Sequence, residues 1–284
     1  MTTSPLPEPV SGPASDTASG SEIERTFGDG VPMAAPPSGI VEAPLGALAE
    51  WRRFGAFLKR PVLPAHPGRS PGKLKGTLRM LWLDLPIMGV LIAMLSLMAE
   101  LGVELPENIN STLEPSLATF ALIALVAPLL EEFAFRSWLN GLPWLMALVG
   151  LCAAGVMGVP ITLATLDPEG TKPSLNILAL VFIAAGVAAA IVLRKRPRPA
   201  FFEARFALFF WVSSVGFALI HLANYSEGAL ALLLVLVLPQ FALGTMLGYL
   251  RVHYGLMPAI TLHAAHNAIL FSLAMASGGA PGEG

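Results

Sequence analysis

Seven apolar stretches along the chain are each close to the length that a helix needs to cross a lipid bilayer. About 20 helical residues, at about 1.5 Å each, span the roughly 30 Å of hydrocarbon in a membrane. The pattern therefore predicts an all-α fold, a polytopic transmembrane helical bundle of about seven spans, with six to eight possible. The stretches cover residues 81–102, 116–138, 143–165, 174–194, 205–222, 228–250 and 257–277.

The composition agrees with a membrane protein and argues against one class of partner. Hydrophobic residues make up 55% of the chain and charged residues 13%, and the mean hydropathy is +0.68. A soluble protein has about 45–50% apolar and about 25% charged residues. The net charge of -2 offers no excess of positive charge to a phosphate backbone. We therefore expect membrane lipid as a partner and no nucleic acid.

Composition also divides the chain into regions. Residues 1–39 are rich in Pro, Ser, Gly, Thr and Ala, which predicts a disordered tail. Residues 40–78 combine apolar residues at near-helical spacing with arginines and lysines, which favours an interfacial amphipathic helix and a basic linker. A partly ordered linker is the alternative for this region. A transmembrane domain is expected at 79–278, followed by a short tail at 279–284.

Lysines and arginines are distributed unevenly between the connections. They cluster before the first span and at 195–204, whereas 103–115 and 223–227 contain none. Because cytoplasmic connections carry the excess of Lys and Arg, the N-terminus is predicted to be cytoplasmic. The start of the sequence lacks a basic region followed by an apolar one, so no cleavable signal peptide is expected. These features predict an integral protein of the bacterial inner (plasma) membrane.

Three charged residues stand at the end of an apolar run, where ionisable groups are costly and are candidates for function. They are Glu131, Glu132 and Arg136. Residues four apart share a helix face, so Glu132 and Arg136 can form an ion pair, whereas Glu131 points elsewhere and can act as a general base in a cavity. The alternative is that both glutamates mark a helix end at the cytoplasmic interface, with Arg136 reaching toward the lipid headgroups.

Two later apolar stretches carry further polar side chains. Phe217 and His221 share one helix face. His263 and Asn267 also project together from the last stretch, with His266 within reach of the same sector. Imidazole and carboxamide groups that point to one place can stabilise an oxyanion. The alternative is that these groups form hydrogen bonds between membrane helices.

Together the three patterns resemble the CPBP family, which contains CAAX proteases and bacteriocin-processing or self-immunity proteins and is also called the ABI family. The patterns are Glu-Glu-x-x-x-Arg, Phe-x-x-x-His and His-x-x-x-Asn, in that order, each within an apolar stretch of the region 118–277. The resemblance implies a glutamate-type intramembrane endopeptidase whose site opens toward the cytoplasmic side of a helical bundle.

The resemblance also implies roles for individual residues. Glu131 is similar to the glutamate that activates water, and His221 to the histidine that holds or polarises this water. His263 and Asn267 are similar to the pair that stabilises the tetrahedral oxyanion. The remaining residues, of which His266 is not part of the family pattern, are expected to support the site: Glu132, Arg136, Phe217 and His266.

The chain differs from typical members in the distance between the first two patterns. Some eighty residues separate them here, where typical members have a short connection. The added sequence contains two apparent spans, which predicts a helical hairpin inserted at about 143–200. Two added spans preserve the relative direction of the helices that carry the patterns, which is consistent with an intact site.

The leading prediction is an endopeptidase that hydrolyses a peptide bond of a membrane-associated or lipid-linked polypeptide, which enters from the membrane or from the cytoplasmic side. No cofactor is expected. Two histidines and a carboxylate also suit a catalytic zinc ion, so a metal-dependent membrane hydrolase is an alternative, although the chain lacks His-Glu-x-x-His. The other alternative is a non-proteolytic membrane scaffold, regulator or immunity protein of the same family.

Overall fold

The computed structural model describes residues 46–114, 116–158 and 174–276 of the 284-residue chain. The chain divides into two units, 1–40 and 41–284, and all described residues belong to the second. These residues form helices and connections without a β-strand, so the predicted all-α fold is confirmed for them. The disordered tail predicted at 1–39 and the short tail predicted at 279–284 lie outside the described residues.

Among the described residues, four helices are long and apolar enough to cross a membrane, and there are five such spans if a bent pair of helices counts as one. The first is α2 (Lys73–Glu100) and the last is α12 (Leu256–Ala276). The bent pair consists of α10 (Leu230–Leu236) and α11 (Leu238–His253), which meet at 45°. The transmembrane character is confirmed, whereas the count of about seven spans is not.

The other two spans change helix type along their length. One is assembled from four consecutive segments: α3 (Leu117–Ala121), a π-helical turn (Leu122–Val126), α4 (Ala127–Arg136) and a 3₁₀ turn (Ser137–Asn140). The other is α9 (Phe206–Ile220), which continues into a 3₁₀ turn at His221–Asn224. π-helical turns within α-helices are frequent at functional sites. Both irregular spans carry residues of the predicted site.

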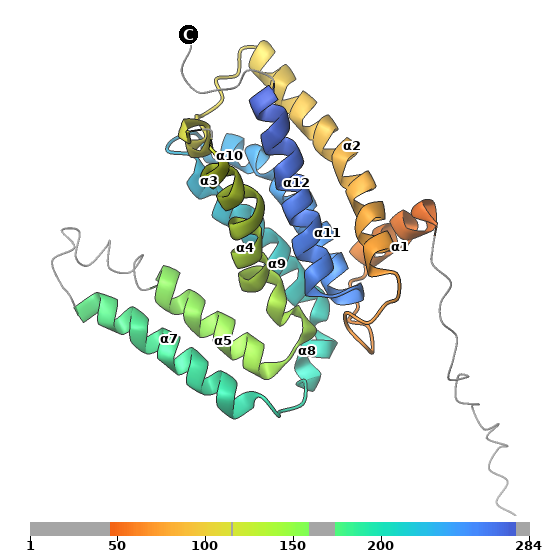
Figure 1. The fold of residues 1–284 in the computed structure, drawn as a ribbon, viewed down its shortest axis with the longest axis vertical. Coiled ribbons are helices and arrows are strands. Elements are labelled where there is room, and N and C mark those ends of the chain that lie inside the picture. Colours follow the sequence, from red (N-terminus) through yellow and green to blue (C-terminus); the bar gives the residue numbers. More distant parts are fainter. Residues whose placement is uncertain (1–45, 115, 159–173, 277–284) are drawn as a thin grey trace, which may run out of the picture. The chain divides into compact units, whose positions relative to one another are not determined.

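Helices α5 (Pro143–Ala153) and α7 (Ser174–Leu193) pack against each other at one side of the bundle (Figure 1). A Cβ atom added at Gly155 would lie 2.8 Å from the carbonyl oxygen of Ala179. Small residues permit this close approach of membrane helices. The two helices occupy the region in which a hairpin is predicted at about 143–200, and the boundaries of that hairpin stay a prediction.

Helix α11 packs against α9, α12 and α2 and is the most buried helix of the structure (Figure 1). Every residue from 243 to 254 is buried. Glycines on α11 bring its neighbours close: a Cβ atom at Gly248 would lie 2.7 Å from the ring of Phe210, and one at Gly244 would lie 3.1 Å from the ring of Phe217. Helix α11 therefore positions α9, which carries Phe217 and leads to His221.

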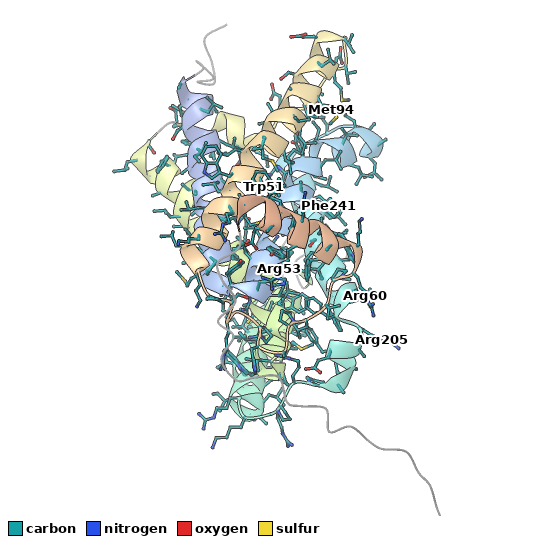
Figure 2. The ribbon with its side chains drawn as sticks, turned by 90° about the vertical axis from the view of Figure 1, so that its right-hand side faces the viewer. Trp51, Arg53, Arg60, Met94, Arg205 and Phe241 are labelled. Atoms are coloured by element: carbon teal, nitrogen blue, oxygen red, sulfur yellow. The ribbon has the colours of Figure 1, made fainter. Side chains whose placement is uncertain are left out.

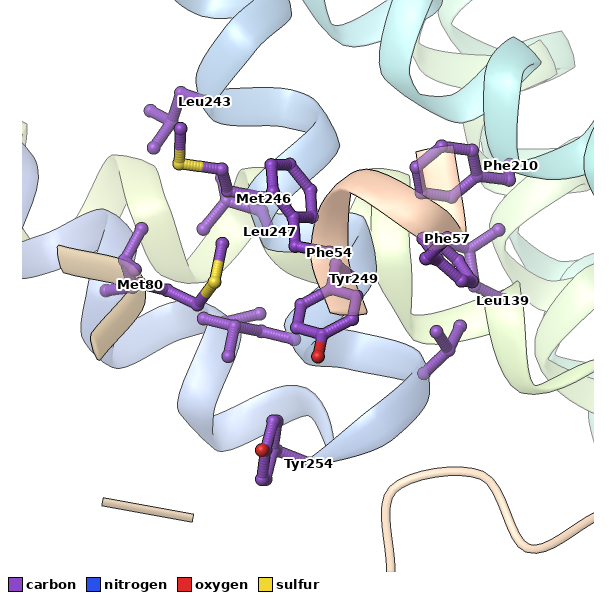
Figure 3. Close-up of a cluster of buried hydrophobic side chains, with 14 of the residues drawn as sticks. Phe54, Phe57, Met80, Leu139, Phe210, Leu243, Met246, Leu247, Tyr249 and Tyr254 are labelled. Carbon is purple, nitrogen blue, oxygen red and sulfur yellow. The ribbon is translucent and has the colours of Figure 1, made fainter. Parts of the chain in front are cut away.

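Helix α1 (Ala47–Lys59) packs its apolar side against α11 (Figure 3). The rings of Phe54 and Phe57 lie 5.3 and 5.5 Å from the ring of Tyr249, edge to face. Arg52 is exposed on the other side of the helix. This helix covers part of the region in which an interfacial amphipathic helix is predicted, and its place at a membrane surface stays a prediction.

A buried carboxylate fastens α1 to the bundle. Glu50 accepts hydrogen bonds from the hydroxyl groups of Tyr249, at 2.5 Å, and Tyr254, at 2.6 Å, and a guanidinium nitrogen of Arg79 lies 3.5 Å from it. Burial and the hydrogen bond to Glu50 raise the pKa of Tyr254, so its hydroxyl group remains a donor at neutral pH. We call these four residues the Glu50 cluster. Both carboxylate oxygens of Glu50 have partners.

Candidate active site

Glu132 and Arg136 form a buried ion pair on α4. Oε1 of Glu132 accepts a hydrogen bond from Nη1 of Arg136 at 3.0 Å, and Nδ1 of His263 lies 3.0 Å from the same oxygen. Neither Glu132 nor Arg136 is exposed. The pair predicted from the four-residue spacing is therefore present. It also reaches a histidine of α12, which the spacing does not reveal.

Several contacts hold the guanidinium group of Arg136 in place. Its central carbon lies 3.8 Å from the ring centroid of Phe217, a cation–π contact, and Nη2 donates to the carbonyl oxygen of Gly244 at 3.5 Å. Arg251 of α11 closes the end of α4 by donating to the carbonyl oxygens of Arg136, at 2.8 Å, and Ser137, at 2.7 Å. Basic side chains satisfy helix C-termini in this way. Sequence reasoning assigned no structural role to Arg251.

Glu131 lies beside this pair but faces a cavity. Its side chain is 30% exposed, and its Oε2 is buried without a hydrogen-bond partner, 3.7 Å from Nε2 of His263. One imidazole ring therefore stands between two carboxylates, with Nδ1 toward Glu132 and Nε2 toward Glu131. Neighbouring residues diverge by about 100° around a helix, which explains why the two glutamates have different surroundings.

His221 is oriented by the end of α9. The backbone N–H of His221 donates to the carbonyl oxygen of Ala218, which leaves the carbonyl oxygen of Phe217 to the imidazole Nδ1 at 2.7 Å. A carbonyl oxygen can only accept a hydrogen bond, so Nδ1 of His221 carries the proton. In the neutral ring, Nε2 is then the nitrogen that can accept one. The Phe217 ring also contacts the rings of His221, at 4.7 Å, and His263, at 5.5 Å. Phe217 thus positions both histidines.

Asn267 is tied to the π-helical turn before α4. In this turn the N–H of Ala127 donates to the carbonyl oxygen of Leu122, five residues back. The next residue, Pro128, has no N–H, so the carbonyl oxygen of Ile123 lacks the corresponding donor. Nδ2 of Asn267 donates to this oxygen at 2.9 Å. One of the two N–H groups of the Asn267 amide is therefore used within the protein, and the other is left over.

His266 has a partner that sequence reasoning missed. Its Nδ1 lies 2.6 Å from Oδ2 of Asp84, a residue of α2 that is fully buried. Oδ1 of Asp84 has no hydrogen-bond partner. The available signal was the carboxylate itself, because an acidic residue within an apolar span is costly without a partner.

These side chains surround one cavity of about 430 Å³. Six of the eight predicted site residues line it, and the other two, Glu132 and Arg136, lie directly behind His263. Its walls are otherwise mostly apolar. The additional polar residues, which sequence reasoning missed, are Gln240 of α11 and Asn108, Asn110, Asn224 and Tyr225. The six lining residues are Glu131, Phe217, His221, His263, His266 and Asn267.

Buried oxygen atoms without a hydrogen-bond partner gather around this cavity. In the described part of the chain, four carboxylate or carboxamide oxygens are of this kind, and they belong to Asp84, Glu131, Glu132 and Gln240. Glu131 and Gln240 line the cavity, while Asp84 and Glu132 hold the two histidines of α12 that line it. An unsatisfied buried acceptor costs about 1–3 kcal/mol. The cavity is therefore suited to a bound molecule that supplies hydrogen-bond donors.

Histidines and carboxylates are also the side chains that bind zinc. Within the described ranges, no three His, Cys, Asp or Glu side chains are close enough together to hold a metal ion. That activity needs no cofactor stays a prediction.

Comparison with known proteins agrees with the three sequence patterns. A family model described as Rce1-like, type II CAAX prenyl endopeptidase, matches residues 113–269, which is more than half of the chain and includes all eight predicted site residues. No curated protein and no solved structure matches the chain. The match, together with the membrane-spanning helices, shows that the chain belongs to the Rce1-like family of type II CAAX prenyl endopeptidases, a family of intramembrane proteases.

Proposed function

We propose that the protein is an intramembrane endopeptidase that hydrolyses a peptide bond of a membrane-associated or lipid-linked polypeptide, with Glu131 as the general base. The observation that carries the proposal is the contrast between the adjacent glutamates. Glu132 is engaged by Arg136 and His263, whereas Glu131 presents an unpartnered oxygen next to His263 at the cavity. A base in a cavity can reach a water molecule, and a base in a closed ion pair cannot.

In the proposed reaction, Glu131 takes a proton from a water molecule while the water oxygen forms a bond to the peptide carbonyl carbon. The carbonyl oxygen becomes an oxyanion. In this proposal, the remaining N–H of Asn267 and an N–H at Nε2 of His263 donate to the oxyanion. The C–N bond then breaks, and the leaving nitrogen takes the proton from Glu131.

His221 has a different part in this mechanism. Because its Nδ1 is committed to the carbonyl oxygen of Phe217, its Nε2 can accept a hydrogen bond from the water that Glu131 deprotonates. The contact of the Phe217 ring with both histidines keeps their rings in fixed orientations. Preorganised groups of this kind act without reorganisation during the reaction.

The substrate and the assignment of Glu131 can be tested in one experiment. Membranes from cells that contain the wild type are compared by quantitative proteomics with membranes that contain Glu131→Gln, and Glu100→Gln, an exposed residue of α2, is the matched control. We expect a polypeptide that accumulates uncleaved with Glu131→Gln only. Equal processing in all three membranes would contradict the proposal.

Two further measurements separate the alternatives. Cleavage that survives treatment with a chelator supports the glutamate mechanism, and cleavage that is lost and restored by zinc supports a metal-dependent hydrolase. A biological function retained by Glu131→Ala would favour a non-proteolytic scaffold or immunity protein.

A further inference from the structure

Gln240 carries a polar atom that the proposed mechanism does not use. Its carboxamide lines the cavity, and within the described part of the chain its Oε1 is buried without a hydrogen-bond partner. The side chain belongs to the start of α11, where the next residue, Phe241, is labelled in Figure 2. An unsatisfied buried acceptor is costly, so such a group in a folded protein needs an explanation.

The start of α11 does not use this oxygen. Gln240 is the third residue of α11, the position from which a Gln or Glu side chain accepts a hydrogen bond from the N–H of the residue before the helix. That residue is Val237, and its N–H donates instead to the carbonyl oxygen of Leu233 in α10, at 3.2 Å. Because α10 leads directly into α11 at the bend, Oε1 of Gln240 is left to the cavity.

The neighbours of Gln240 show which side of α11 it occupies. The ring of Phe241 faces α9, where it stacks on Trp211 at a centroid distance of 6.1 Å. Leu236 and Leu243 both line the cavity and are buried. Since residues three or four apart share a helix face, Gln240 lies on the same side as Leu243. It is therefore a polar group in an apolar part of the cavity wall.

Gln240 also lies close to the candidate catalytic residues. Gly244 follows it by one turn, and a Cβ atom there would lie 3.1 Å from the ring of Phe217, which contacts His221 and His263. Four helical residues advance by about 6 Å. An extended polypeptide advances by about 7 Å in two residues. An extended substrate whose scissile bond lies at the two histidines therefore has a peptide group within reach of Gln240.

A carboxamide is complementary to a peptide group. Its oxygen accepts a hydrogen bond from a backbone N–H, and its nitrogen donates to a backbone carbonyl oxygen. This kind of recognition requires an N–H that is free, which proline lacks and which a helical segment has already used. An anionic headgroup would need basic partners, and none of the described residues that line the cavity is Lys or Arg.

We propose that Gln240 binds the main chain of the substrate, with its Oε1 accepting a hydrogen bond from a peptide N–H about two residues from the scissile bond. The substrate is then a polypeptide that is extended around its cleavage site and has a residue other than proline at that position. This inference rests on the proposed peptidase function. It adds a contact that selects among polypeptides and takes no part in breaking the bond.

N-methylation of single peptide bonds tests this contact, because the methyl group removes one N–H and leaves every side chain as it was. The probes are a peptide that covers the cleavage site of the polypeptide accumulating with Glu131→Gln, and the same peptide with an N-methyl group at each residue in turn. The values of kcat and KM are measured for the wild type and for Gln240→Met, which has a side chain of similar length without the carboxamide. Leu270→Met, elsewhere in the cavity lining, is the matched control.

We expect one N-methyl position to raise the KM of the wild type and of Leu270→Met by about tenfold, the effect of losing one hydrogen bond at a buried acceptor. Gln240→Met should have a KM about tenfold higher for the unmodified peptide, with kcat within about twofold of the wild type. At the position that Gln240 contacts, the methyl group should then have no further effect on Gln240→Met.

Two results would overturn the proposal: a wild-type KM of Gln240→Met for the unmodified peptide, or equal effects of N-methylation on the wild type and Gln240→Met at every position. A fall in kcat at unchanged KM would also contradict a role in binding. If Gln240→Met does not fold, Gln240→Asn, whose oxygen is withdrawn by one methylene group, takes its place. All these results leave the role of Glu131 untouched, whereas normal cleavage of the unmodified peptide by Glu131→Gln would remove the proposed function.

Discussion

The Glu50 cluster and the residues around the cavity use similar side chains in opposite ways. Glu50 is fully buried, and both of its carboxylate oxygens have partners. Glu131, Glu132 and Asp84 each keep one buried oxygen without a partner. The burial of a carboxylate therefore does not distinguish a structural group from a functional one. The difference lies in whether an unsatisfied atom faces the cavity: both oxygens of Glu50 are satisfied within the protein, whereas the unsatisfied oxygen of Glu131 lies at the cavity and is available to a ligand.

The largest expected difference in turnover is between variants of two buried histidines, His263 at the cavity and His253 beside Tyr249 of the Glu50 cluster. Nδ1 of His263 faces Glu132, whereas Nδ1 of His253 lies 3.0 Å from the carbonyl oxygen of Tyr249 and its ring packs on Phe57. We expect His263→Gln to lower turnover by about 10²–10³, the effect of losing one oxyanion donor. His253→Gln should lower the unfolding temperature without lowering turnover per folded molecule. Equal loss of turnover in both variants would break the comparison.

Asp84→Asn tests whether the contact between Asp84 and His266 serves the reaction, like the residues around the cavity, or only stability, like the Glu50 cluster. The substitution keeps the size of the side chain and removes the charge next to His266. A hydrogen bond to a charged group is worth about 1.5–3 kcal/mol, so we expect turnover to fall by about 10–100-fold and its pH profile to change. Turnover per folded molecule and its pH profile are measured with the unfolding temperature. A loss of stability alone would place Asp84 with the structural carboxylates.

Glu50→Gln is expected to act on stability only. An amide satisfies one of the two tyrosine hydroxyl groups less well and loses the charge near Arg79, which costs about 1–3 kcal/mol. Turnover per folded molecule should stay within about 2-fold, because the cluster lies outside the cavity lining. The matched control is Glu203→Gln, which loses an exposed pair with Arg198 worth about 0–1 kcal/mol. A selective loss of turnover in Glu50→Gln would show that α1 participates in the reaction.

Pro128→Ala is expected to cause the smallest change in free energy. The new N–H can donate to the carbonyl oxygen of Ile123 and compete with Asn267 for it. We expect turnover to fall by less than about tenfold, or about 1.4 kcal/mol, because Asn267 is loosened rather than removed. Pro143→Ala, at the start of α5, is the control for removing a proline from a helix start. Higher turnover in Pro128→Ala would mean that the contact with Ile123 restrains Asn267 from acting.

Helical spacing in the sequence predicted relations within single helices. It placed Glu132 with Arg136 and separated Glu131 from both, and the structure contains this arrangement. The resemblance then grouped patterns from three different stretches, and their side chains meet around one cavity. The catalytic roles stay predictions, because contacts describe where side chains lie and not what they do.

Contacts between helices were not predictable from spacing. Asp84 and His266 are 182 residues apart, and Tyr249 is 199 residues from Glu50. No local pattern specifies such pairs, since they depend on which helices pack together. The π-helical turn before Pro128 was equally hidden, because its sequence is an ordinary apolar run.

Turnover by the purified protein in liposomes tests the central claim most directly. The polypeptide that accumulates with Glu131→Gln is supplied as substrate, and the cleavage rates of the wild type, Glu131→Gln and Glu100→Gln are compared at equal amounts of folded protein. The account predicts that Glu131→Gln loses cleavage by about 10²–10⁴-fold, the contribution of a general base, and that Glu100→Gln matches the wild type. Cleavage by Glu131→Gln at the wild-type rate would contradict it.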